Sequence, residues 1–174
     1  MSPDSLVKIF APLFMEDKME GPVLDLACGR GQNGLYLAEL GLPVILADRS
    51  PEALKEAQKS AEGKNLEVSF LEVDLEGGEN PLRKEFYRGI LVFRYLHRPL
   101  IPFIRDGILK GGILIYETFT LDQTKYGAPH HPDHLLRSGE LFEWFKDWQM
   151  FHFFEGLLDN PPRAMAQIVC RKPY

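Results

Sequence analysis

Short apolar runs rich in valine, isoleucine and leucine alternate along the chain with segments in which apolar residues recur at helical spacing. This alternation predicts a parallel β-sheet with helices on both faces, because each buried strand needs a crossover to reach the next. The predicted parallel strands are Pro22–Ala27, Pro43–Ala47, Leu66–Asp74, Arg88–Phe93 and Gly111–Tyr116.

Three helices are predicted between these strands. The first follows a glycine-rich turn and stops at Gly41, since glycine commonly follows a helix end. The second begins at Ser50 and Pro51, because serine can cap a helix and proline suits its first turn, and it ends near Gly63. The third is predicted over Pro99–Leu109 from its apolar positions.

The pattern changes near the C-terminus. Trp148–Leu158 and Arg163–Arg171 have the character of strands, and only a short turn joins them. A pair with so short a connection is antiparallel, because a parallel partner needs a crossover of a dozen or more residues.

Length and composition limit the possible classes of protein. The 174 residues predict a single domain spanning 1–174. A net charge of -5 argues against a nucleic-acid partner, and the absence of an apolar run of about 20 residues argues against a membrane span. Only Cys28 and Cys170 are present, which favours reduced thiols and a cytoplasmic location. The sequence predicts no particular oligomeric state.

The end of the first strand carries the first candidate binding feature. Gly29, Gly31 and Gly34 form the spacing GxGxxG, which lets a backbone turn approach a ligand and aims unpaired N–H groups of the next helix at it. This spacing serves nicotinamide, flavin and other adenosine ligands, and tight turns also use it without any ligand.

Acidic residues follow at the next two strand ends. Asp48 can accept hydrogen bonds from both ribose hydroxyls of an adenosine, and Asp74 can receive its exocyclic amine. Either residue alone also suits a turn or a helix cap. Taken in series with the glycine turn, the two aspartates favour an adenosine ligand.

Asp25 separates the candidate ligands because it lies inside the first strand, where aliphatic side chains are usual. A buried carboxylate needs hydrogen bonds or a cation, so it would repel a pyrophosphate and favour a ligand with an ammonium and a sulfonium. Asp25 would equally serve to fix the backbone of the glycine turn.

The run VLDLACGRGQNGLYLAELGLPVILADRSPEAL, followed by FLEVDLEG and GGILIYETF, resembles class I S-adenosylmethionine-dependent methyltransferases. The resemblance covers the chain from about Pro22 and implies a Rossmann-like, doubly wound α/β fold. That fold has a mostly parallel seven-stranded sheet, a C-terminal antiparallel pair and helices on both faces. The implied cofactor is S-adenosyl-L-methionine, and the residues implied to bind it are Asp25, Ala27, Cys28, Gly29, Gly31, Asp48, Arg49, Asp74, Leu75 and Phe93.

The fourth strand end supplies the candidate catalytic residues Arg94, Tyr95 and His97. The family often has an acidic or amide residue at this strand end, whereas Arg94 stands here and suits an anionic acceptor. Pairing of Arg94 or Arg98 with a surface carboxylate is an equal alternative. His97 has a pKa suited to a general base, and it would also suit a cap for the helix at Pro99.

Thr118–Arg137 is long for a connection in a compact domain, and such segments often cover binding sites. It carries Tyr126 and three histidines, so we predict a mobile lid over the acceptor, with a plain surface loop as the alternative. We predict no metal site, because the adjacent His130 and His131 diverge.

Val92–Ile104 and the segment after Tyr116 are also similar to tellurite-resistance methyltransferases and, more remotely, to thiopurine methyltransferases. That resemblance implies a small-molecule acceptor that is anionic or a soft nucleophile. Two other functions fit the same motifs: a nicotinamide-dependent oxidoreductase, and a non-catalytic module that binds an adenosine ligand.

Overall fold

The computed structural model describes residues 2–16, 19–78 and 80–174, in which a seven-stranded sheet has the order β3-β2-β1-β4-β5-β7-β6. Strands β1 to β5 are parallel, and β7 runs antiparallel to both β5 and β6. The predicted fold class and C-terminal antiparallel pair are therefore confirmed. The strands are β1 (Val23–Leu26), β2 (Val44–Asp48), β3 (Val68–Glu72), β4 (Tyr87–Phe93), β5 (Ile108–Phe119), β6 (Gln149–Leu158) and β7 (Arg163–Arg171).

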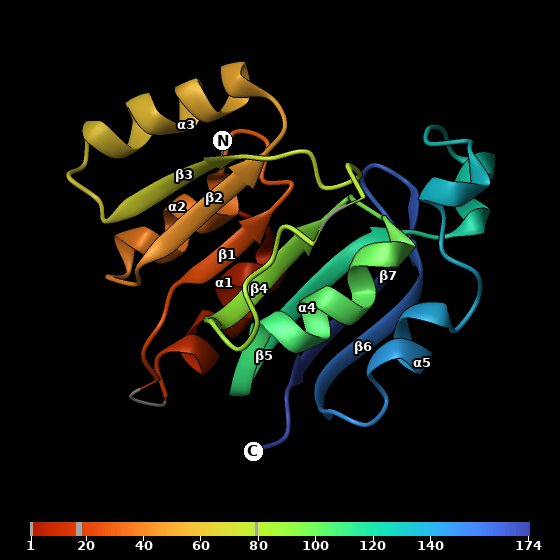
Figure 1. The fold of residues 1–174 in the computed structure, drawn as a ribbon. Coiled ribbons are helices and arrows are strands. Elements are labelled where there is room, and N and C mark those ends of the chain that lie inside the picture. Colours follow the sequence, from red (N-terminus) through yellow and green to blue (C-terminus); the bar gives the residue numbers. More distant parts are fainter. Residues whose placement is uncertain (1, 17–18, 79) are drawn as a thin grey trace.

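Helices cover both faces of the sheet (Figure 1). Side chains of α4 and α5 pack into one core cluster, and those of α1, α2 and α3 pack into the other. Short 3-10 turns lie between the longer elements. The α-helices are α1 (Ser5–Phe10), α2 (Gln32–Glu39), α3 (Pro51–Glu62), α4 (Ile101–Gly107) and α5 (Glu140–Phe145), and the 3-10 turns are η1 (Ala11–Phe14), η2 (Arg98–Leu100), η3 (Leu121–Lys125) and η4 (Pro132–His134).

The helix starts and stops that the sequence predicted are largely confirmed. The hydroxyl of Ser50 accepts a hydrogen bond from the backbone N–H of Ala53 at 3.2 Å, and Pro51 is the first residue of α3. Helix α2 ends just before Gly41, which has a φ of 89°. Glycine adopts this left-handed backbone conformation without strain, and the conformation ends the helix.

The prediction of a helix over Pro99–Leu109 was wrong at its end. Helix α4 stops at Gly107, and β5 begins at Ile108 and continues to Phe119. Ile108 is buried and pairs with Tyr87 in β4. The register between β4 and β5 shifts immediately after this pair. An apolar residue suits a helix face and a buried strand equally, so periodicity alone could not place this boundary.

The N-terminal apolar stretch forms α1 and η1, which close over the sheet. Asp4 caps α1 by accepting a hydrogen bond from the N–H of Leu6 at 3.0 Å. Val7 and Phe14 are buried in the same cluster as Val23 of β1. Among the described residues, no helix has both the length and the apolar character needed to cross a membrane.

Candidate functional site

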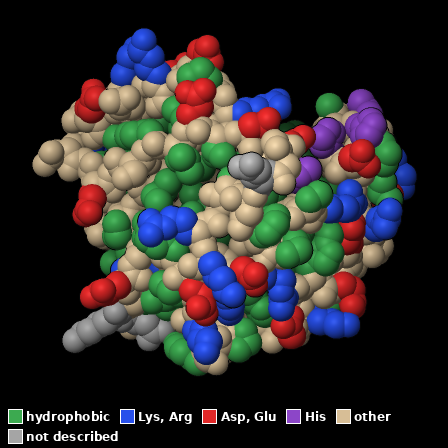
Figure 2. All heavy atoms as spheres, in the orientation of Figure 1, with side chains coloured by type: hydrophobic (Ala, Val, Ile, Leu, Met, Phe, Trp, Pro, Cys, Tyr) green, Lys and Arg blue, Asp and Glu red, His purple; other side chains and the backbone are tan. Residues whose placement is uncertain are grey.

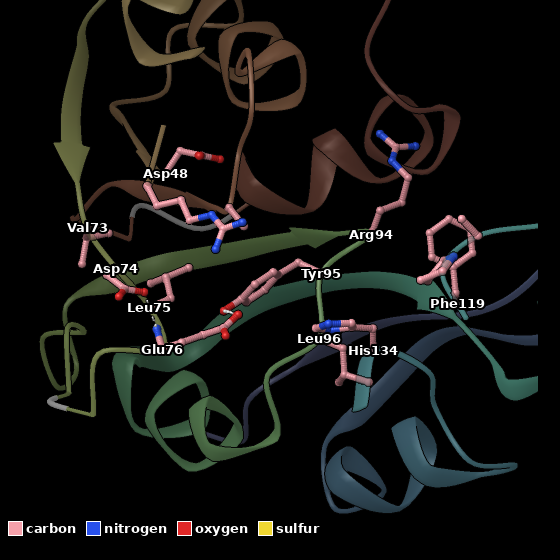
Figure 3. Close-up of a pocket in the computed structure, with 14 residues that line it drawn as sticks. Asp48, Val73, Asp74, Leu75, Glu76, Arg94, Tyr95, Leu96, Phe119 and His134 are labelled. Atoms are coloured by element: carbon pink, nitrogen blue, oxygen red, sulfur yellow. Dashed lines mark hydrogen bonds between the residues drawn. The ribbon is translucent and has the colours of Figure 1, made fainter. Parts of the chain in front are cut away.

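The candidate site lies at the carboxyl ends of the parallel strands, where the strand order reverses. From β1 the sheet extends to β2 and β3 on one side and to β4 and β5 on the other, and open α/β sheets bind ligands at this point. The main cavity, about 670 Å³, opens here between Asp48, Leu75, Arg94 and Phe119 (Figure 3).

A smaller hollow of about 170 Å³ shares Arg94 with the main cavity and is called the inner hollow below. Asp25, Gly29, Asn33 and Phe93 contribute to its lining. Together the two spaces run from the glycine turn, past the end of β4, toward the loop after β3.

The glycine turn leaves open space for a ligand. Gly29 has a φ of 55°, and a Cβ added there would meet no atom within 4 Å. Its N–H donates to the Asp48 carboxylate at 2.7 Å, which holds the turn against the end of β2. Gly31, with a φ of 73°, is the N-cap of α2, so the unpaired N–H groups at this helix start suit an anionic group.

Asp25 lies beneath this turn and is 2% exposed. Its carboxylate accepts a hydrogen bond from the N–H of Gly34 at 2.8 Å, so it does fix the turn, as the alternative interpretation proposed. Burial, together with the nearby Asp48, raises the pKa of Asp25 to about 7, although the Gly34 bond and Arg94 oppose the shift. A bound cation would stabilise the carboxylate form.

The residues predicted for the adenosine end line the main cavity together. Asp48, Arg49, Asp74 and Leu75 all border it, and Leu75 is buried while Asp74 is exposed. One Asp74 oxygen accepts from the N–H of Glu76 at 3.0 Å, which orders the loop after β3. The cavity therefore has acidic groups at two strand ends and an apolar surface between them.

Arg94 and Tyr95 diverge from the end of β4 (Figure 3). Arg94 has a φ of 55°, and its guanidinium lies 4.0 Å from the Asp4 carboxylate at the start of α1. The Tyr95 hydroxyl donates to Glu76 at 3.4 Å, and burial together with Glu76 raises its pKa. Both residues line the main cavity.

His97 is not brought to the main cavity. It lines a neighbouring pocket of about 480 Å³, which shares Leu96 and His134 with that cavity. It is the N-cap residue of η2, but its side chain makes no capping hydrogen bond there. This geometry therefore does not support His97 as a general base that reaches the main cavity.

Residues 120–139, called the covering segment below, close one side of the main cavity. Ala128, Pro129 and His134 line it, whereas Tyr126 is exposed and does not. Figure 2 shows histidine side chains gathered on this part of the surface. Within the described ranges, no group of three or more potential ligands is arranged to hold a metal ion.

The covering segment is fastened to the body at two points. The buried side chain of Gln123 donates to the carbonyl of Ala128 at 3.0 Å and accepts from the N–H of Ala164 at 2.8 Å. Arg98 forms a bidentate pair with Glu140 at 2.7 and 2.8 Å and donates to the backbone carbonyl of Leu135 at 2.9 Å. The alternative of pairing with a carboxylate is thus met by Arg98 with Glu140 and, at the longer distance of 4.0 Å, by Arg94 with Asp4.

Arg98→Lys is expected to loosen the covering segment while leaving the donor site intact. A lysine cannot reproduce the planar fork, so the contacts to Glu140 and Leu135 would not all survive. Hydrogen exchange of backbone amides 131–139 should accelerate about tenfold, which corresponds to the loss of roughly one strong hydrogen bond.

The matched control is Lys125→Ala, which removes only an exposed pair with Asp122. It should leave exchange in residues 131–139 unchanged. Unchanged exchange in Arg98→Lys as well would mean that Arg98 does not hold the segment.

Three polar residues near the site were missed from the sequence. Asn33 and Glu117 are buried, and Asn33 accepts a hydrogen bond from the N–H of Asp4 at 2.8 Å. Gln123 is the third. A signal existed only for Glu117, which is a charged residue within the apolar run GGILIYETF, as Asp25 is within its own strand.

The tellurite resistance protein TehB family matches residues 15–160 of the chain. The chain belongs to this family. The resemblance to class I methyltransferases and to their tellurite-resistance subgroup is thereby confirmed.

A relative from Haemophilus influenzae (strain 10810), named as a probable S-adenosyl-L-methionine-dependent methyltransferase TehB, is 29% identical over 140 residues. The match covers 78% of this chain and 48% of the relative, so the chain spans about half the length of the curated relatives it matches most fully. An uncharacterized methyltransferase, YodH of Bacillus subtilis, is 36% identical over 55 residues, 32% of this chain and 24% of its own.

Solved structures share the fold. The crystal structure of TehB from Haemophilus influenzae superposes with a TM-score of 0.82 at 22% identity, covering 97% of this chain and 62% of that one. A geranyl diphosphate C-methyltransferase from Streptomyces coelicolor, solved with S-adenosyl-L-homocysteine, gives a TM-score of 0.72 at 12% identity over 97% of this chain and 77% of its own. The Rossmann-like methyltransferase fold is therefore established.

Proposed function

We propose that this protein binds S-adenosyl-L-methionine and transfers its methyl group to a small-molecule acceptor that is anionic or a soft nucleophile. The observation that carries the proposal is the buried Asp25 carboxylate directly under an open glycine turn. Such a carboxylate suits a cationic ligand, and the unpaired N–H groups at the start of α2 suit the carboxylate of an amino acid.

The residues present suit each part of this cofactor. Asp25 and the backbone from Ala27 to Gly31 would hold the amino-acid end in the inner hollow. Asp48 retains oxygen lone pairs for ribose hydroxyls beyond the two backbone N–H groups that it accepts from Gly29 and Ser50. Leu75, with Asp74 beside it, would border the adenine, and Phe93 would border the sulfonium.

When bound, the cofactor supplies a methyl group activated by positive sulfur. The work of this chain is then to bind, to align and to exclude water. Arg94 offers a guanidinium at the junction of the two hollows, where it suits an anionic acceptor. Ala128, Pro129 and His134 wall the cavity from the opposite side and limit access of water.

The nicotinamide alternative is disfavoured by the same carboxylate. A pyrophosphate on the glycine turn would lie above Asp25, and the two negative groups would repel each other. Mixing the protein with reduced nicotinamide cofactor is expected to give no enhancement of its fluorescence, and a saturable enhancement would support the oxidoreductase instead.

Calorimetric titration with S-adenosylhomocysteine tests the donor site. We expect saturable binding by the wild type and a loss of about a hundredfold in Asp48→Ala, because that change removes the ribose contact and releases the glycine turn. The matched control is Glu143→Ala in α5, which removes an exposed carboxylate that pairs with Lys146. Equal affinity in all three proteins would contradict the proposal.

Transfer itself is tested by supplying labelled donor with anionic, thiol and metalloid acceptors. We expect label in at least one small product. Donor binding without transfer to any acceptor would favour the non-catalytic adenosine-binding module.

A further inference from the structure

Asn33 is a buried polar side chain at the wall of the inner hollow. It lies in the first turn of α2 and borders the hollow, and only 4% of its surface is exposed. The amino-acid end of the donor is proposed to lie in this hollow. Asn33 is therefore placed to contact that end of the ligand, although the sequence did not single it out.

The orientation of the Asn33 amide is fixed by the chain. Oδ1 accepts a hydrogen bond from the N–H of Asp4 at 2.8 Å, and because a backbone N–H can only donate, the oxygen and nitrogen of the amide cannot be exchanged. Within the described residues Nδ2 has no hydrogen-bond partner, and it is not among their fully enclosed unpaired atoms, so open space reaches it. Buried polar groups are nearly always paired, so Nδ2 indicates a missing acceptor.

The backbone at the start of α2 offers further donors beside Nδ2. Gly31 is the N-cap, and the N–H groups of Gln32 and Asn33 have no backbone partner in the described part of the chain. Gln32 also borders the inner hollow. A helix start with free N–H groups attracts anions, so side-chain and backbone donors are available here to one anionic group.

The neighbouring residue supplies the opposite charge. Gly34 donates to the Asp25 carboxylate at 2.8 Å, so an acid and a set of free donors meet at consecutive residues of α2. An ammonium cannot accept from Nδ2, and an anion would be repelled at Asp25. An α-amino acid carries an ammonium and a carboxylate on one carbon, which suits this arrangement.

Two arginines also border the inner hollow, but each already faces a carboxylate. Arg30 pairs with Glu56 at 2.7 Å, and Arg94 lies 4.0 Å from Asp4 and borders the main cavity as well. Their side chains are about half exposed, whereas Asn33 is buried. The buried donor without a partner among the described residues is thus Asn33.

We propose that Nδ2 of Asn33 binds the carboxylate of the donor's amino-acid end and makes the site selective for adenosine ligands that carry a free carboxylate. This inference rests on the proposed function and names a specificity-determining residue of its donor site. Asp4 acts through Asn33 as a positioning residue, because its N–H fixes the amide with Nδ2 free.

The test compares two ligands by calorimetry at pH 8. One is S-adenosylhomocysteine, and the other is its decarboxylated form, which retains the adenosine and the ammonium but lacks the carboxylate. The main variant is Asn33→Asp, in which an oxygen can still accept from the N–H of Asp4 while the Nδ2 donor is replaced by negative charge. The control is the same change at Asn65, which is exposed and borders neither hollow.

We expect the wild type to bind S-adenosylhomocysteine at least about tenfold more tightly than the decarboxylated form, the size usual for a hydrogen bond to a charged group. Asn33→Asp should weaken S-adenosylhomocysteine about a hundredfold and leave the decarboxylated form unchanged or tighter, because loss of the donor is joined by repulsion between two carboxylates. Asn65→Asp should match the wild type. Should Asn33→Asp not fold, Asn33→Ala carries the same comparison, with a loss of about tenfold confined to S-adenosylhomocysteine.

An equal loss on both ligands, or no loss on either, would give Asn33 no contact with the carboxylate and overturn the inference while the proposed function stands. A wild type without preference between the ligands would do the same without any variant. Arg94→Gln is expected to keep the preference, and its loss there but not in Asn33→Asp would assign the carboxylate to Arg94 instead. Binding of neither ligand by the wild type would count against the proposed function, and the inference would fail with it.

Discussion

Replacing Asp25 by Asn is expected to lower the affinity for S-adenosylhomocysteine by at least about a hundredfold at pH 8. The amide can still accept from the N–H of Gly34, but it offers no charge to the ligand's ammonium, and breaking a buried charge pair costs about 3–5 kcal/mol. Calorimetry measures the loss, with the exposed Asp122→Asn as the control. The wild type should itself bind more weakly below pH 7, since Asp25 is then protonated.

The same variant is expected to be more stable than the wild type at pH 8. The pKa of Asp25 is about 7 in the folded protein against an ordinary value of 3.8, so its contribution to stability is fully present below pH 3.8 and is lost as the pH rises through 7. A difference of about three pKa units corresponds to roughly 4 kcal/mol of stability that the wild type loses at pH 8. The uncharged Asn does not lose it. Urea unfolding should show the gap at pH 8 and nearly none at pH 4. A variant that is less stable at pH 8 and binds normally would contradict a ligand role for Asp25.

Gly34→Ala is expected to reduce the free energy of unfolding by about 1–3 kcal/mol, the usual cost of overpacking. An added Cβ would collide with Leu46 Cδ2 and lie 3.1 Å from the Cβ of Asp25, so α2 would have to move away from the sheet. Donor affinity should fall with it, because Gly34 donates the bond that orients Asp25. Urea unfolding and calorimetry measure the two effects.

Gly29→Ala is the matched comparison within the same turn. A Cβ there meets nothing within 4 Å, so only the positive φ of 55° opposes it, at about 1–2 kcal/mol. We expect the smaller loss of stability of the two, with donor affinity still reduced at least about tenfold, because the methyl group enters the space left for the ligand. Unchanged affinity in Gly29→Ala would mean that no ligand approaches the turn.

The donor half of the site was predictable because strand ends and glycines carry strong local signals. GxGxxG, Asp48 and Asp74 follow one another along the chain, and a parallel sheet brings their positions to one edge whatever the loops do. Asp25 was found by a different rule, since a charged residue inside a buried strand demands a partner. Applied to β5, that rule also selects Glu117.

The acceptor half depends on contacts that periodicity does not encode. Tyr126 or one of the three histidines of its segment was expected over the cavity; Tyr126 is exposed, whereas His134 lines the cavity together with Ala128 and Pro129. His97 was expected beside the donor, yet it lines the neighbouring pocket. A single residue's place in an irregular segment follows from side-chain hydrogen bonds that form only in the folded chain.

The decisive experiment for the donor site is a crystal structure of the protein grown with S-adenosylhomocysteine. We expect density for the amino-acid end in the inner hollow, with the ammonium at Asp25, the ribose hydroxyls at Asp48 and the adenine beside Leu75. Density for a diphosphate on the glycine turn, or an inner hollow filled by the protein's own side chains in that crystal, would contradict it.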